Sequence, residues 1–241
     1  MCGRFVQYSD PDLYRQEFQL DLVCAAQPRY NVAPSQNILA IRAGQDAKRR
    51  LHWLRWGLIP AWSRGPEPRF ATINARAETL AEKPAFRMPF RHQRCLVPSE
   101  GFYEWHAEAG GKQPYLIRSR SGRPFVMAGL WDSWRDPAGR VVESCALVVT
   151  QANDVIRPIH ERMPVILAGT GLATWLDPGI QEPALLTPLL GPCPPEWLEC
   201  FPVSRRVNSP YQDDAELPMP LTAPRQGELA VDVAQARRPV P

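Results

Sequence analysis

Residues 2–8 alternate between apolar and polar positions, which is typical of a strand. Further apolar segments with strand character follow along the chain, and Gly, Pro and Asp turns separate most of them. We expect these strands to form one compact sheet system. The predicted strands are residues 2–8, 36–43, 51–59, 94–99, 101–108, 113–120, 124–134, 144–151 and 200–208.

Four segments have helical character instead. Residues 9–18 start with Ser and Asp, residue types that cap helix N-termini, and predict a short helix. A longer helix is predicted to start just after Asn74 and to end or kink at Pro84. We expect all four to pack outside the sheet. The segments are residues 9–18, 74–86, 172–179 and 182–190.

The composition is that of a globular protein able to bury a core. Apolar residues make up 44% of the 241 residues and charged residues 22%, and this length suits one large domain. No apolar run is long enough to cross a membrane, and the start of the chain lacks the pattern of a secretory signal. We therefore expect a cytoplasmic protein without membrane contact, associated with the nucleoid when it is bound to DNA.

Proline is concentrated near the C-terminus, where 12 of the 27 prolines follow Glu182. Such a composition is typical of segments that do not pack into a core. We expect a single domain over residues 1–212 and a flexible, proline-rich tail over residues 213–241.

The six cysteines favour free thiols over a metal site or a disulfide framework. They include no Cys-x-x-Cys pair, and the two closest, Cys193 and Cys200, lack histidines at metal-ligand spacing. Without a signal peptide, a set of disulfides is not expected. We expect no metal and no cofactor.

Basic residues are frequent in the first hundred positions, although the net charge of the chain is only +3. Aromatic residues are interleaved with them. Cations neutralise phosphates and flat rings stack on unpaired bases, so this mixture is typical of single-stranded nucleic-acid binding. The alternative is a solvated arginine surface over a tryptophan core. The residues are Lys48, Arg49, Arg50, Arg55, Arg64, Arg69, Arg76, Arg87, Arg91 and Arg94, with Trp53, Trp56, Trp62 and Phe70.

The cysteine at position 2 carries a distinctive chemistry. Removal of Met1 would leave Cys2 with a free α-amine and a thiol on adjacent carbons. The amine can condense with an aldehyde to an imine, and the thiol can then close a thiazolidine ring. The same pair could serve acyl transfer, with the amine as base. The simplest alternative is that Cys2 is a small residue at the start of a strand.

Three other residues are candidates for acid–base work beside such a nucleophile. Glu104 lies among aromatic residues, which would raise its pKa if it is buried. His160 lies in a loop before an apolar stretch, and Asn74 precedes a predicted helix. Each also has a structural explanation: an outward-facing glutamate, a packed histidine and a helix cap.

Six motifs in one order carry a resemblance to a known family. They are "MCGRF", "RYNVAPSQ", "WGLIPAW", "INARAET", "CLVPSEGFYEW" and "IHERMPVIL". The chain resembles the SRAP family of SOS response-associated peptidase-like proteins, which process abasic sites in DNA. The resemblance covers residues from Cys2 to about Asn208 and leaves out the proline-rich tail.

The resemblance implies an α+β fold in which a branched, mainly antiparallel sheet curls into a pseudo-barrel with peripheral helices. It implies that Cys2 bonds covalently, as a thiazolidine, to the aldehyde of an abasic site in single-stranded DNA. Asn74 would orient the cysteine or the sugar, Glu104 would be the general acid and base, and His160 would help to open the sugar ring and support reversal. We expect the protein to act as a monomer.

The resemblance also implies a path for the DNA. The phosphates would be bound by Arg4, Arg76 and Arg162. The strand would be lined by Trp62, Trp105 and Thr150, and the adjoining loop would be shaped by Pro34 and Asn31. One departure concerns "GLIPAW", where a single tryptophan is followed by Ser63, which leaves open how bases stack there.

The proposed chemistry requires removal of Met1. This removal is either autocatalytic or left to an aminopeptidase.

Two other function classes fit parts of the sequence. An N-terminal-nucleophile amidotransferase also starts Met-Cys-Gly, but this sequence has no Asn-Gly pair, and we expect no second domain after the first. A non-catalytic single-stranded DNA-binding module would suit the basic and aromatic composition. It would leave Asn74, Glu104 and His160 without a shared purpose.

Overall fold

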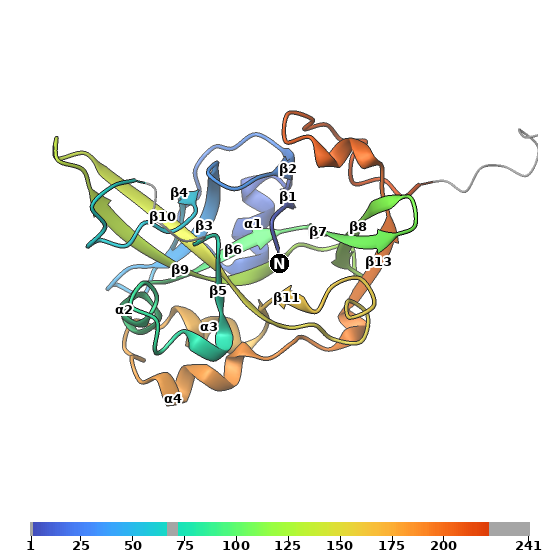
Figure 1. Ribbon diagram of the computed structural model, residues 1–241. Coiled ribbons are helices and arrows are strands. Elements are labelled where there is room, and N and C mark those ends of the chain that lie inside the picture. The colour runs from blue at the N-terminus through green and yellow to red at the C-terminus, as the bar shows by residue number, and fades with distance from the viewer. Residues whose placement is uncertain (1, 67–71, 222–241) are drawn as a thin grey trace, which may run out of the picture.

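The computed structural model describes residues 2–66 and 72–221, which form two β-sheets with short helices around them (Figure 1). The strand-rich pattern predicted from the sequence is confirmed. The strands are β1 (Phe5–Gln7), β2 (Arg29–Val32), β3 (Asn37–Ala43), β4 (Arg49–Trp56), β5 (Asn74–Arg76), β6 (Arg94–Ser99), β7 (Gly101–Glu108), β8 (Gly111–Ser119), β9 (Phe125–Arg135), β10 (Val141–Gln151), β11 (Arg162–Pro164), β12 (Ile166–Leu167) and β13 (Leu198–Pro202).

Five strands close into a barrel. The larger sheet runs β11-β10-β4-β3-β6-β9-β12, and an additional pairing of β10 with β9 closes the ring. Most pairs are antiparallel, but β4 lies parallel to β10, so the barrel is mixed. The expected pseudo-barrel with a branched, mainly antiparallel sheet is therefore confirmed.

The branch lies on β10. The first part of this strand pairs with β4 on one side and β9 on the other, whereas its last residues pair with β5 and β11. Leu147 lies opposite Asn74 in the parallel pair of β10 and β5. This branch brings β5 and β11, which are far apart in sequence, to the two edges of one strand.

The second sheet, in the order β13-β8-β7-β1-β2, packs against the barrel. The buried side chain of Gln7 on β1 joins the two sheets: its Nε2 donates to the carbonyls of Leu39 and Pro98, and its Oε1 accepts the N–H of Leu39. The start of the chain therefore lies near the centre of the molecule (Figure 1).

Both faces of the barrel strands are buried. On β3, Leu39 and Ile41 belong to one apolar cluster, and Ile38 and Ala40 belong to another. Cys2 lies in the second cluster. Alternating side chains along each strand thus supply two cores, one on either face of the sheet.

The helices are short and peripheral. α1 (Pro11–Phe18) is capped by Asp10, whose carboxylate accepts the N–H of Asp12 at 2.8 Å, as the sequence predicted. α2 (Arg87–His92), α3 (Thr170–Leu176) and α4 (Pro183–Leu186) lie together on one side (Figure 1). None of the helices in the described residues is long and apolar enough to cross a membrane.

The helix predicted for residues 74–86 is wrong. Asn74–Arg76 forms strand β5 because it pairs with β10, a tertiary contact that local helix propensity does not anticipate. A single 3-10 turn follows at Ala77–Thr79, and the next helix starts only at Arg87. The strand β2 was not predicted, and the last predicted strand ends at Pro202, before a 3-10 turn at Arg205–Asn208.

The chain continues to pack on the domain beyond the boundary expected at residue 212. Leu217 is fully buried with Val6 and Tyr103, and the Asp213 carboxylate accepts the backbone N–H of Tyr30. Residues 222–241, the greater part of the expected tail, lie outside the described residues, as do Arg69 and Phe70.

Candidate active site

Cys2 lies three residues before the start of β1, and its side chain is fully buried. Burial raises the pKa of its thiol, the nearby charge of Glu104 raises it further, and a hydrogen bond from the backbone of Arg4 lowers it. The thiol is therefore held in its protonated form, and it needs a base before it can act as a nucleophile.

Asn74 holds Cys2 from β5. Its Nδ2 donates to the carbonyl oxygen of Cys2 at 2.8 Å. Its Oδ1 is buried and has no hydrogen-bond partner among the described residues. A buried amide oxygen without a partner is costly in a fold and is typical of a site that awaits a ligand.

Glu104 lies on β7, and its buried carboxyl is close enough to Cys2 to raise the pKa of the thiol. Burial raises the pKa of its carboxyl, while the charge of His160 lowers it in part. A carboxyl with a raised pKa keeps its proton closer to neutral pH, which suits a general acid.

His160 is oriented by the start of β11. Its Nδ1 accepts the backbone N–H of Arg162 at 2.9 Å. This contact fixes the orientation of the imidazole ring at the start of β11. The fold thus brings together Cys2, Asn74, Glu104 and His160 from four separate segments, through the contacts and charge interactions given above.

Two arginines expected to bind phosphate lie at the edges of the branch on β10. Arg76, the last residue of β5, is exposed. Arg162, the first residue of β11, forms an ion pair with Glu78 at 2.5 Å. Thr150 on β10 is buried in this structure and lies opposite Met163. Glu78 was not singled out in the sequence, because an ion pair between distant segments leaves no local signal.

The aromatic candidates differ in exposure. Trp62 is 60% exposed, so its ring is free to meet a ligand. Trp105 is half-buried, and its indole N–H donates to Asn208 Oδ1 at 2.7 Å. Of the other tryptophans in the basic stretch, Trp56 is fully buried in the core and Trp53 is 41% exposed. The expected mixture of basic and aromatic residues is therefore partly core and partly surface.

Arg4, the third expected phosphate ligand, is engaged within the protein. Its Nη1 donates to Asn31 Oδ1 and to the Val207 carbonyl, both at 2.8 Å. Asn31, which the sequence pointed to only as a loop residue, is fully buried at this junction. Pro34 lies in the turn between β2 and β3, half-buried.

The described residues contain no group of three or more His, Cys, Asp or Glu side chains placed to hold a metal ion. All six cysteines are free thiols.

Comparisons with known proteins agree with the fold and the motif order. The abasic site processing protein YoaM of Bacillus subtilis is 43% identical over 221 residues, which cover 90% of this chain and 97% of that protein. YedK of Escherichia coli, also an abasic site processing protein, is 30% identical over 228 residues, 92% of this chain and 100% of that protein. A crystal structure of a Bacteroides thetaiotaomicron protein, 28% identical, superposes with a TM-score of 0.78 over 92% of this chain and 100% of that one. A family model described as SOS response associated peptidase (SRAP) matches residues 1–210, and the chain belongs to this family.

Proposed function

We propose that this protein processes abasic sites in single-stranded DNA by bonding covalently to the sugar aldehyde through Cys2. The observation that carries the proposal is the convergence on Cys2 of a hydrogen bond from Asn74 and the charge of Glu104. The abasic site processing proteins YoaM and YedK, 43% and 30% identical over most of the chain, support the same substrate.

The reaction starts with removal of Met1, which frees the α-amine of Cys2. The open-ring sugar presents an aldehyde, and the amine adds to its carbon to form a carbinolamine. Loss of one water gives an imine. The thiol then adds to the imine carbon and its proton passes to the nitrogen, which closes a thiazolidine. The net change is one C–N bond and one C–S bond formed for one water lost.

Glu104 and His160 would move the protons. Because burial raises the pKa of Glu104, the carboxyl can protonate the departing hydroxyl of the carbinolamine. The resulting carboxylate can then accept the proton of the Cys2 thiol, which burial keeps on sulfur. His160, held by the backbone N–H of Arg162, would donate a proton to the ring oxygen when the closed sugar opens. The same groups would act in reverse if the crosslink is undone.

The DNA would cross the site along cations and aromatic rings, of which Arg76 and Trp62 are exposed. Arg76 and Arg162 would contact the phosphates on either side of the abasic sugar, and Trp62 and Trp105 would stack on neighbouring bases. Pro34 and Thr150 would line this path. A sugar carbon inside a stacked duplex is out of reach, so a single strand is the expected substrate.

A denaturing gel tests the proposal. The protein is incubated with an oligonucleotide that carries one abasic site, and a species that survives denaturation is expected. Cys2→Ala should remove it, while Cys200→Ala, a matched change at a partly exposed thiol, should leave it intact. An uncleaved N-terminal tag should also block it, because the amine is then acylated.

The same experiment separates the proposal from a non-catalytic binding module. An oligonucleotide whose abasic aldehyde has been reduced to an alcohol should bind but never crosslink. Salt-sensitive binding without any adduct from the wild-type protein would favour the binding module. An adduct that persists in Cys2→Ala would show that another nucleophile reacts.

A further inference from the structure

Arg4 connects the nucleophile to the C-terminal part of the chain. Its backbone is hydrogen bonded to the Cys2 thiol, and its carbonyl accepts the N–H of Tyr103, the residue before Glu104, at 2.9 Å. Its side chain donates to Asn31 and to the Val207 carbonyl, 203 residues away in sequence. One residue therefore contacts the nucleophile, the strand that carries Glu104 and the end of the domain.

Asn31 links Arg4 to the end of the domain through further hydrogen bonds. The side chain is fully buried, its Oδ1 accepts from Arg4, and its backbone N–H donates to Asp213 at 3.0 Å. The amide nitrogen lies within hydrogen-bonding distance of three backbone carbonyls, so Asn31 closes the loop that contains them. They are those of Val207 at 3.3 Å, Ser209 at 3.0 Å and Gln212 at 2.7 Å.

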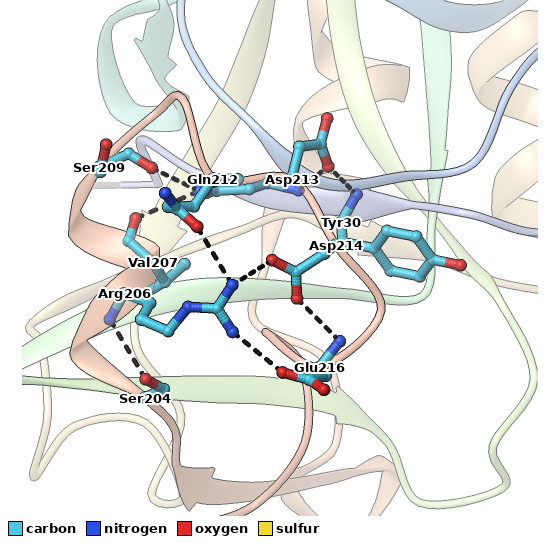
Figure 2. A network of polar contacts seen from close by, with 10 residues as sticks. Tyr30, Ser204, Arg206, Val207, Ser209, Gln212, Asp213, Asp214 and Glu216 are labelled. Carbon is cyan, nitrogen blue, oxygen red and sulfur yellow. Dashed lines mark hydrogen bonds and ion pairs between the residues drawn. The ribbon is translucent and has the colours of Figure 1, made fainter.

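The segment 205–217, which we name the C-terminal clamp, is stiffened by its own contacts. Figure 2 shows the guanidinium of Arg206 joined to three side chains of the same segment. Leu217 is fully buried against Tyr103 and Val207 in a small apolar cluster. The clamp is thus a fixed anchor for Arg4. The partners of Arg206 are Gln212 at 3.1 Å, Asp214 at 2.5 Å and Glu216 at 3.1 Å.

We propose that Arg4 is a positioning residue through which the C-terminal clamp holds Cys2 for reaction. The inference rests on the proposed function. Once Met1 is removed, Cys2 is the end of the chain, and its amine and thiol must both reach one carbon atom. A chain end held on one side only would sample many unproductive orientations, and fixing it removes that cost from the reaction.

This role differs from the phosphate contact expected for Arg4. Nη1 is already bonded to two oxygens of the protein, and Nε is buried without a partner among the described residues. The ring of Trp105 lies beside the guanidinium, with the Arg4 Cζ 6.0 Å from its centroid. A phosphate would have to compete with these contacts, whereas the Arg76 side chain is exposed to solvent.

The test separates positioning from DNA affinity. Single-turnover crosslinking is measured at saturating abasic oligonucleotide, and the Kd is measured with the reduced oligonucleotide, which cannot react. Arg4→Met should lower the saturating rate by about 10- to 100-fold while leaving the Kd unchanged. Arg205→Met, an exposed arginine of the clamp, should match the wild type in both. Arg76→Met should raise the Kd.

Two further measurements exclude a charge effect. Asn31→Ala releases the clamp without changing any charge and should slow the saturating reaction in the same way. Reaction of the Met1-free protein with glyceraldehyde, which has no phosphate, should be slowed by Arg4→Met by a similar factor. Thermal melting confirms that each variant is folded.

The outcomes are distinct. If Arg4→Met raises the Kd and leaves the saturating rate unchanged, Arg4 binds phosphate and the inference is overturned. If it slows the reaction with DNA but not with glyceraldehyde, the inference is also overturned. A wild-type protein that forms no adduct at all overturns the proposed function, and this inference with it.

Discussion

Asn74→Ala should leave the stability of the fold almost unchanged but slow crosslinking strongly. The wild-type side chain makes one hydrogen bond, from Nδ2 to the carbonyl of Cys2 at 2.8 Å, and leaves Oδ1 buried without a partner among the described residues. Removing the side chain therefore removes one satisfied contact and one unsatisfied atom together.

The two stability effects have opposite signs and similar sizes. Loss of the hydrogen bond leaves the buried Cys2 carbonyl unpaired, which costs about 1–3 kcal/mol, and loss of the orphan Oδ1 returns a comparable amount. The net change in the free energy of unfolding should be within about 1 kcal/mol. In the proposed reaction, however, both ends of the amide would be used, Nδ2 on the Cys2 carbonyl and Oδ1 on the sugar. Losing about 1.4–2.7 kcal/mol of that stabilisation slows the rate by about 10- to 100-fold.

Urea unfolding and single-turnover crosslinking measure the two quantities. Asn153→Ala is the matched control, because its amide is buried and satisfied at both ends, by Cys193 and Ile156. It should lose stability by about 1–3 kcal/mol and, while folded, crosslink at the wild-type rate. The opposite pattern, an unstable Asn74→Ala that crosslinks normally when folded, would refute the assignment of Asn74 to the site.

Three further predictions concern the proton donor and the DNA path. Because burial raises the pKa of Glu104, the folded protein binds that proton more tightly than the unfolded chain, and the contribution of this group to stability is lost as the pH rises through the folded-state pKa. Glu104→Gln should remove that loss in a pH series of urea unfolding; an unchanged series would refute it. Trp62→Ala should weaken binding to any single strand by about 1–3 kcal/mol without changing the saturating rate, and a sequence-specific loss would contradict stacking. Arg76→Met should reduce the slope of log K against log salt by about 0.7, whereas an unchanged slope would mean that Arg76 contacts no phosphate.

Strands were the part of the fold that the sequence predicted well. On β3 and β10, successive apolar residues enter two different apolar clusters, so burial on both faces imposes a continuous apolar run on each strand. Such runs do not say which strands pair. Closure of the barrel depends on β10, which pairs with four other strands, and no local pattern carries that information.

The failed helix shows the limit of local signals. Residues 74–86 contain good helix formers, yet their first three residues join β10 in a parallel pair. That pairing presents the Asn74 amide to the Cys2 carbonyl. A helix from residue 75 would have assigned Asn74 the role of a cap, so the tertiary pairing determines its side-chain contact as well as its conformation.

The candidate site could be predicted only in part. The pair of thiol and amine at Cys2 follows from its position in the sequence, and the motif resemblance pointed to Asn74, Glu104 and His160. The contact of Arg4 with Val207 spans 203 residues, and neither segment has a distinctive composition. The clamp therefore became visible only in the structure.

The intact mass of the adduct tests the central claim most directly. The protein is incubated with an oligonucleotide bearing one abasic site, and the product is measured by mass spectrometry under denaturing conditions. We predict the mass of the protein without Met1 plus that of the DNA, less one water, with the modification mapped to Cys2. A product that retains Met1, or an adduct mapped to a lysine or to another cysteine, would contradict the mechanism.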